Sequence, residues 1–176
     1  MTTGYMLLSA LIVNGAHGYL VYSQRNERKR SISSHAANSR GAYLLYLAAH
    51  LLGGIFFLLF AHELFLDGFH QMWLYYLSWI TVVFESVQAF IPSRGRTEKV
   101  HSLTAYCMWL FYLLVGTLAV ILIPLSVNRR MILLPFLLTP MALGIYAYFN
   151  RKKMYWLQML IIGIYCSGMI LLSLLV

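Results

Sequence analysis

Charged residues are scarce in this sequence. Lys, Arg, Asp and Glu make up 10% of its 176 residues, whereas soluble domains carry about 25%. Acidic residues are the rarest, with 5 Asp and Glu against 13 Lys and Arg. The net charge of +8 does not indicate a nucleic-acid binder, because the cations lie in short gaps between apolar runs. We therefore expect no nucleic-acid partner.

Cysteine is also scarce, with two in the chain. Cys107 and Cys166 both fall inside apolar runs, where we interpret them as small buried apolar residues. They indicate neither a disulfide framework nor a zinc site. No small-residue cleavage site follows the first apolar run, so no cleavable signal peptide is predicted.

Long apolar runs dominate the sequence instead, and 61% of the residues are hydrophobic. A spanning helix needs about 20 mostly apolar residues, and hydrocarbon offers no partner for unpaired backbone groups. The sequence therefore predicts an all-α fold, a single six-helix transmembrane bundle over residues 1–176. The fifth span carries Pro135 and Pro140, which predict a kink. The six predicted spans cover about 5–22, 41–65, 72–91, 100–125, 131–149 and 154–176.

The loops predict the orientation. The second loop has no cation and carries Glu63 and Asp67, and the fourth has Arg129 and Arg130. The positive-inside rule places loops one, three and five in the cytoplasm and both termini outside, as in a multi-pass protein of a plasma or inner membrane. We expect membrane lipids as partners. Loops one, three and five hold the other cations: Arg25, Arg28, Lys29, Arg30 and Arg40, then Arg94, Arg96 and Lys99, then Arg151, Lys152 and Lys153.

The first loop, Ser23 to Arg40, is the only long connection. Its content of Ser, Asn and Arg predicts a mobile segment or one that lies on the surface.

A few ionisable residues lie inside the predicted spans, where each costs several kcal/mol unless it faces protein or water. At about 1.5 Å per residue, His17, His50 and Glu85 lie roughly 8, 13 and 9 Å from the cytoplasmic ends of spans one, two and three. His101 opens span four at the same surface. These four groups predict a polar pocket in the inner leaflet.

Helical spacing adds further residues to this pocket. Thr81, Glu85 and Gln88 recur at intervals of three and four and so share one face, as do Asn14 and His17. Because lipid rejects polar stripes, we expect them to face one another. A buried carboxylate near histidines can hold a proton near neutral pH. The predicted pocket therefore binds a lipid or another amphipathic ligand, or couples to protons, through Glu85, Gln88, His17, His50, His101, Asn14 and Thr81.

Four alternatives stay open. Polar residues also serve as hydrogen-bonded contacts between helices, and a chain this small suits a non-catalytic scaffold subunit beside other membrane subunits. His17 and His50 lie beside small residues, which a bis-histidine haem b of a cytochrome subunit would need. The loop residues His62, Glu63, Asp67 and His70 form a candidate metal site, although the helical zinc pattern is absent.

An enzyme is the least expected class. The sequence contains no Gly-x-Ser-x-Gly elbow, no pair of aspartates inside spans and no phosphate-binding glycine loop. Acid–base catalysis by Glu85 with a histidine remains the one open possibility for chemistry.

One short stretch resembles a known group of proteins. Val87-Gln-Ala-Phe closes the third span, a short loop covers 92–99, and Val100-His101-Ser-Leu-Thr-Ala opens the fourth span. Together with six spans, these residues are similar to the DRAM- and Sfk-type six-helix membrane proteins and to related uncharacterised bacterial six-helix proteins. The resemblance implies a six-helix bundle associated with membrane lipids or membrane regulation, and it implies no reaction. Ile91-Pro92 and the basic loop depart from the pattern.

Overall fold

The computed structural model describes residues 1–23, 31–149 and 154–176, and these residues form helices and no strand. A π-helix, η2 (His62–Gly68), continues from α3, and a 3-10 turn, η3 (Gly95–Thr97), precedes α5. The α-helices are α1 (Thr2–Ser23), α2 (Ile32–Ala36), α3 (Arg40–Ala61), α4 (Met72–Phe90), α5 (Glu98–Leu122), α6 (Val127–Phe149) and α7 (Met154–Leu175).

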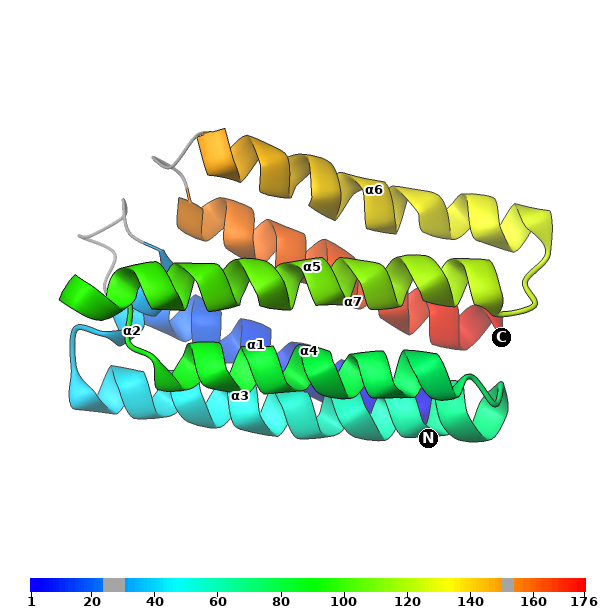
Figure 1. The fold of residues 1–176 in the computed structure, drawn as a ribbon, viewed down its shortest axis with the longest axis horizontal. Helices are drawn as coiled ribbons and strands as arrows, with labels where there is room; N and C mark the ends of the chain where they lie inside the picture. The colour runs from blue at the N-terminus through cyan, green and yellow to red at the C-terminus, as the bar shows by residue number, and fades with distance from the viewer. Residues whose placement is uncertain (24–30, 150–153) are drawn as a thin grey trace.

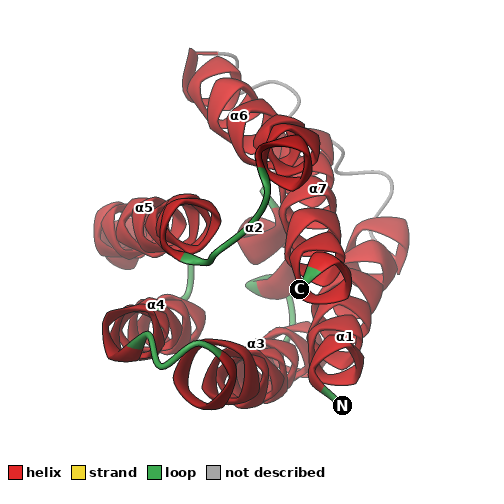
Figure 2. Cartoon of the chain, turned by 90° about the vertical axis from the view of Figure 1, so that its right-hand side faces the viewer, coloured by secondary structure: helices red, strands yellow, loops and turns green. Residues whose placement is uncertain are grey.

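The long helices lie alongside one another with both termini at the same end (Figure 1). Seen along their length, α1, α3, α4, α5 and α7 enclose an interior, and α6 lies outside against α7 (Figure 2). Helix α1 packs on α3 and α7, while α4 packs on α3 and α5. All six long helices contribute side chains to the interior, since Leu133 of α6 is buried in the same apolar cluster as residues of the other five.

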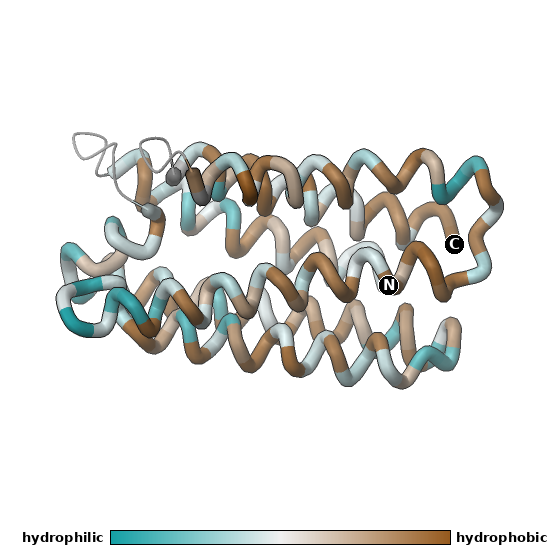
Figure 3. The backbone as a smooth tube through the Cα atoms, turned by 45° about the horizontal axis from the view of Figure 1, so that its top comes forward, coloured by the Kyte–Doolittle hydropathy of each residue, from teal (hydrophilic) through white to brown (hydrophobic). Residues whose placement is uncertain are grey.

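Five of the described helical segments are long and apolar enough to cross a membrane: Thr2–Ser23, Arg40–Gly68, Gly95–Leu122, Val127–Ala147 and Trp156–Leu175. By helix length and hydropathy the chain is a polytopic membrane protein. Hydrophilic residues gather toward the two ends of the helices, and hydrophobic residues recur along the length between them (Figure 3).

The predicted third span is missing from that set. Helix α4 is 19 residues long and matches the predicted range of 72–91 closely, but its hydropathy falls short. Four polar side chains on its buried face account for the difference: Ser78, Thr81, Glu85 and Gln88. The same residues that predicted a pocket thus remove α4 from the helices that qualify by hydropathy.

Four boundaries differ from the prediction. The first span begins at Thr2 instead of Tyr5, and the fifth begins at Val127 instead of Met131. The second span ends as an α-helix at Ala61 and continues as a π-helix to Gly68, and the fourth ends at Leu122 instead of Leu125. Helix α6 is one continuous element through Pro135 and Pro140. The kink stays a prediction.

The expectation for the first loop is wrong in its described part. Residues Ile32–Ala36 form helix α2, begun by a hydrogen bond from the Ser34 amide to the Ser31 side chain. Ile32 and Ala36 are buried in a cluster with Leu20, Tyr46 and Ala89. The Ile32 amide also donates to Gln158 Oε1 of α7 at 3.1 Å. Helix α2 therefore fills the end of the interior between α1, α3 and α7.

Two consecutive glycines set the spacing of the helices around the site. A Cβ at Gly53 would collide with Val13 Cγ2 of α1, and one at Gly54 would lie 2.8 Å from Val82 Cγ1 of α4. Helix α3 is therefore in close contact with α1 on one side and α4 on the other. His50 lies one helical turn before this pair, so the contacts hold it between the two neighbouring helices.

Candidate functional site: a buried chain of histidines and a carboxylate

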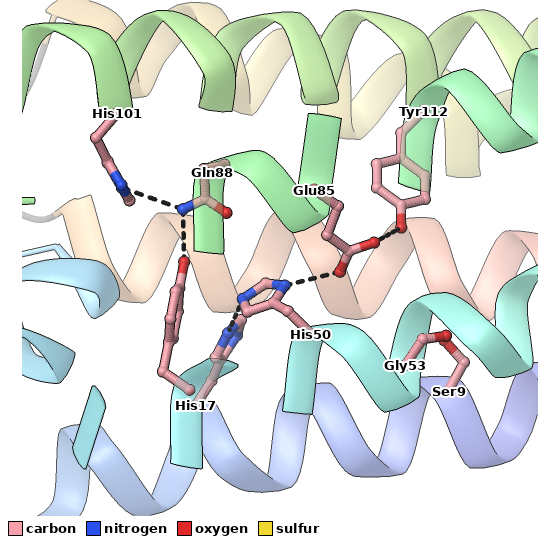
Figure 4. Close-up of polar contacts among 9 residues, drawn as sticks. Ser9, His17, His50, Gly53, Glu85, Gln88, His101 and Tyr112 are labelled. Atoms are coloured by element: carbon pink, nitrogen blue, oxygen red, sulfur yellow. Dashed lines mark hydrogen bonds and ion pairs between the residues drawn. The ribbon is translucent and has the colours of Figure 1, made fainter. Parts of the chain in front are cut away.

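Three predicted residues form a continuous hydrogen-bonded chain across three helices. His17 Nε2 of α1 lies 3.1 Å from His50 Nε2 of α3, and His50 Nδ1 lies 2.7 Å from Glu85 Oε1 of α4. The side chains point toward one another inside the molecule (Figure 4). All three residues are at most 4% exposed. The structure thus gathers one titratable side chain from each of three adjacent helices.

A tyrosine provides a second hydrogen bond to the carboxylate. Tyr112 of α5 donates its hydroxyl proton to Glu85 Oε2 at 2.5 Å. Oxygens of an ionised carboxylate only accept hydrogen bonds. With Glu85 ionised, His50 carries its proton on Nδ1 and, when neutral, accepts at Nε2 a bond donated by His17 Nε2–H. The chain then has one direction, from His17 through His50 to Glu85.

The far end of this chain has no partner. His17 Nδ1 is buried and makes no hydrogen bond. The His17 ring stacks on Tyr46, with centroids 5.7 Å apart. A buried imidazole nitrogen without a partner is uncommon in proteins, and with Nε2–H donating it is the acceptor of a neutral ring. His17 Nδ1 therefore has a lone pair that can accept a proton.

A second polar group lies beside the first. Gln88 Nε2 contacts the Tyr46 hydroxyl at 2.6 Å and His101 Nε2 at 3.1 Å. His101 Nδ1 lies 2.6 Å from the Ile91 carbonyl oxygen, so Nδ1 carries the proton and a neutral His101 accepts the bond that Gln88 donates. The Tyr46 ring meets His50 edge-on at 4.3 Å. His101 thus folds back from the start of α5 and closes the loop after α4.

The carboxylate also faces a cavity. A space of about 50 Å³ is lined by residues of α1, α3, α4, α5 and α7, among them Glu85 and His50. Most of its lining is apolar or aromatic, and it includes Phe57, Trp109 and Tyr165. The Tyr165 hydroxyl is buried and makes no hydrogen bond. The cavity therefore combines an acid, an unused hydroxyl and an apolar wall.

Two predicted residues do not join the chain from His17 to Glu85. Thr81 donates to the Leu77 carbonyl of its own helix at 2.8 Å. Asn14 donates to the Ala10 carbonyl of its own helix at 2.9 Å and also makes a side-chain hydrogen bond with Cys166 of α7, which lines the cavity. Small polar side chains in apolar helices commonly bond to the backbone of their own helix.

Sequence reasoning missed the three tyrosines of the site. Tyr46 precedes His50 by four residues, and Tyr112 follows His101 by eleven, so each shares a helix face with a predicted residue. This spacing could have indicated Tyr46 and Tyr112. Nothing in the sequence marks Tyr165, because α7 carries no ionic residue near it and its place at the cavity depends on packing.

The haem alternative does not fit the pair of histidines. A metal–nitrogen bond of about 2 Å on each side would separate the two Nε2 atoms by about 4 Å, whereas they are 3.1 Å apart and bonded to each other. Gly53 is occupied in packing against Val13. The neighbouring cavity of about 50 Å³ is far smaller than a porphyrin.

The predicted loop metal site does not assemble either. Among the described residues no group of three or more His, Cys, Asp or Glu is placed to hold a metal. His62 Nδ1 pairs with Asp67 Oδ2 at 3.1 Å, and Glu63 instead accepts from the Thr2 hydroxyl at 2.9 Å. Asp67 is thus used in a contact within the loop itself, and Glu63 in a contact with the start of α1.

Comparison with protein-family models, with curated proteins and with solved structures found no match for this chain.

Proposed function

We propose that this chain is a six-span membrane protein in which His17, His50 and Glu85 bind and pass an exchangeable proton. The chain of hydrogen bonds from His17 Nε2 to Glu85 supports this proposal most directly. Inside a membrane such a buried ionisable chain is expensive. The free-energy cost of burying these three residues is lower when each can pass its proton to the next.

The charge surrounding Glu85 is consistent with a proton site. The ionisable groups that face it are His17 of α1, His50 and Tyr46 of α3, Tyr112 of α5, and Tyr165 and Cys166 of α7. His101 lies in the adjacent group. Within 1–23, 31–149 and 154–176, no Lys or Arg pairs with the carboxylate. A proton is then the available counter-charge.

The relay needs no movement of a side chain. A proton binds His17 Nδ1 and converts His17 to an imidazolium. His17 then passes its Nε2 proton to His50 Nε2, and His50 passes its Nδ1 proton to Glu85 Oε1. Both imidazoles end neutral with exchanged tautomers, and the carboxylate ends as a carboxylic acid.

In this proposal α4 is the sixth span. It lies between α3 and α5 and runs alongside them (Figure 1), and its polar residues face the interior instead of lipid. Hydropathy underestimates such a helix, because it counts polar residues regardless of the side that they face.

The proposed orientation puts the site in the cytoplasmic half with both termini outside. Of the predicted cytoplasmic cations, Arg40, Arg94, Arg96 and Lys99 are described, whereas Arg25, Arg28, Lys29, Arg30, Arg151, Lys152 and Lys153 lie outside the described residues. At the other end Arg129 donates to the Leu175 carbonyl at 2.5 Å and Arg130 to the Ile123 carbonyl at 3.3 Å. These two cations are used to cap helix C-termini.

Infrared difference spectroscopy of the purified protein tests the proton site, because a carboxylic acid has a carbonyl stretch that a carboxylate lacks. We expect one such band in the wild type, and we expect it to grow as the pH is lowered. Glu85→Gln should remove the band, and Glu63→Gln, at the opposite end, should keep it. His17→Phe should slow the appearance of the band after a pH jump. A titrating band that survives Glu85→Gln, or a spectrum without one in the wild type, would exclude the proposal.

A further inference from the structure

The cavity beside Glu85 has the composition of a binding site for a small organic cation. Besides Glu85 and His50 it is lined mostly by apolar and aromatic side chains, with Met6 and Met108 among them, and by Ser9, whose hydroxyl donates to the Gly53 carbonyl. Its volume of about 50 Å³ compares with about 10–15 Å³ for the smallest cavity that holds one water. The space therefore suits a group of a few heavy atoms and is too small for a lipid headgroup with its chains.

Two oxygens of the lining can accept a hydrogen bond from a ligand. Glu85 offers carboxylate lone pairs beyond the bonds it accepts from His50 and Tyr112. The Tyr165 oxygen has no partner although the residue is 4% exposed. An ammonium group carries three donors and no acceptor. Its hydrogen bonds would satisfy the Glu85 carboxylate and the Tyr165 oxygen at the same time.

The aromatic lining adds to the preference for positive charge. Phe57, Trp109, Tyr112 and Tyr165 all line the cavity. The face of an aromatic ring attracts a cation, by an amount that grows when both are shielded from water. Unbranched methionine side chains can adapt their shape around an alkyl group.

We propose that this cavity binds the ammonium end of a small primary amine, in exchange for the proton that Glu85 holds. The inference rests on the proton site described above. With both histidines neutral and Glu85 ionised, the site carries one negative charge, which either a proton or an ammonium balances. Binding of one excludes the other, because two positive charges would then meet in an interior without a second acid.

Trp109 gives a direct readout of the cavity. The chain has 4 Trp, and the other three, Trp73, Trp79 and Trp156, are exposed at the surface. We would record the indole NH signals of ¹⁵N-tryptophan-labelled protein in detergent and assign them by single Trp→Phe variants. Partition of a probe into the detergent would shift the three exposed signals, whereas binding in the cavity would shift that of Trp109.

The probes are ethylammonium chloride, ethanol and sodium chloride at matched concentrations. We expect ethylammonium alone to shift the Trp109 signal in a saturable manner, with an affinity no better than millimolar because the probe has three heavy atoms. The affinity for ethylammonium should fall about ten-fold for each unit by which the pH is lowered through the range where Glu85 takes up its proton, since one proton competes with one ammonium. Glu85→Gln should abolish the shift, and Glu63→Gln should leave it unchanged.

Tyr165→Phe tests the second oxygen. It should weaken ethylammonium binding about ten-fold, because it removes one hydrogen bond to a charged group. Tyr76→Phe is the matched control, since Tyr76 is 51% exposed and lies outside the cavity lining.

Three results would overturn the amine site: an equal shift with ethanol, binding that survives Glu85→Gln, or no response of Trp109 at any pH. If the infrared band of Glu85 still titrates in that case, the proton site stands and only the ligand class is wrong. If the band is absent as well, both proposals fail together.

Discussion

The two halves of the helical assembly are stabilised by different kinds of interaction. Toward the termini the interior is a cluster of apolar side chains that includes Phe57, Phe60, Phe65 and Leu74. Toward α2 the interior is a set of hydrogen-bonded polar side chains, from His17 to His101. Tight packing holds the first half together, whereas the second is held together by hydrogen bonds between its polar side chains.

The difference between the halves indicates which half can hold a functional site without loss of stability. An apolar half with buried rings resists local opening and keeps the helices in register. The polar half can then keep an unpartnered atom such as His17 Nδ1, which no packing argument explains. Substitutions in the first half should change stability alone, and those in the second should change proton binding.

The largest expected effect on stability is that of Phe60→Ala. Phe60 is fully buried in the apolar cluster, and loss of its ring leaves a cavity that costs about 3–5 kcal/mol. Reversible unfolding in mixed micelles would measure this, with Leu11→Ala at an exposed position of α1 as the control. The infrared band of Glu85 should keep its titration. Loss of that titration would mean that the two halves are not separable.

His50→Phe should cost about 3 kcal/mol at high pH, because it leaves Glu85 ionised and without the hydrogen bond that His50 Nδ1 donates. The loss should shrink as the pH falls, since protonation then removes the uncompensated charge. Unfolding measured across pH would show the slope. Adding Glu85→Gln should remove that slope, and a double variant that keeps it would contradict the assigned pair.

Gly53→Ala should destabilise by about 1–3 kcal/mol, because its methyl group would collide with Val13. It should also disturb proton binding, since it pushes α3 and His50 away from α1. Gly144→Ala is the matched control: a Cβ there meets nothing within 4 Å, so that variant should be neutral or slightly stabilising. If the two variants had equal free energies of unfolding, the glycine pair would not be what positions the site.

The smallest expected effect is that of Tyr112→Phe, at about 1 kcal/mol, because it removes one of the two bonds to Glu85. Its infrared band should move, since the frequency of a carboxyl group depends on its hydrogen bonds. Tyr106→Phe, on the same helix at an exposed position, serves as the control. An unchanged band in Tyr112→Phe would show that this hydroxyl does not bind the carboxyl in solution.

Sequence periodicity determined which residues of each helix face inward. The intervals from Thr81 through Glu85 to Gln88 placed them on one face, and all three are buried together. Length and hydropathy determined the helical class and nearly all the helix ranges. These features are local, because they follow from the helical repeat and from the exclusion of polar groups by lipid.

Tertiary structure alone decided which inward-facing groups meet. Asn14 and Thr81 satisfied the same periodicity as His17 and Glu85, yet Thr81 bonds to its own helix, and Asn14 bonds to its own helix and to Cys166 of α7. The pairing of His50 with Glu85 depends on how closely α3 approaches α4, which the contact of Gly54 with Val82 fixes. The burial of α2 and the place of Tyr165 at the cavity likewise depend on contacts between segments far apart in the chain. A helical repeat sets directions around one axis, and the distances between axes come from the side chains that pack between them.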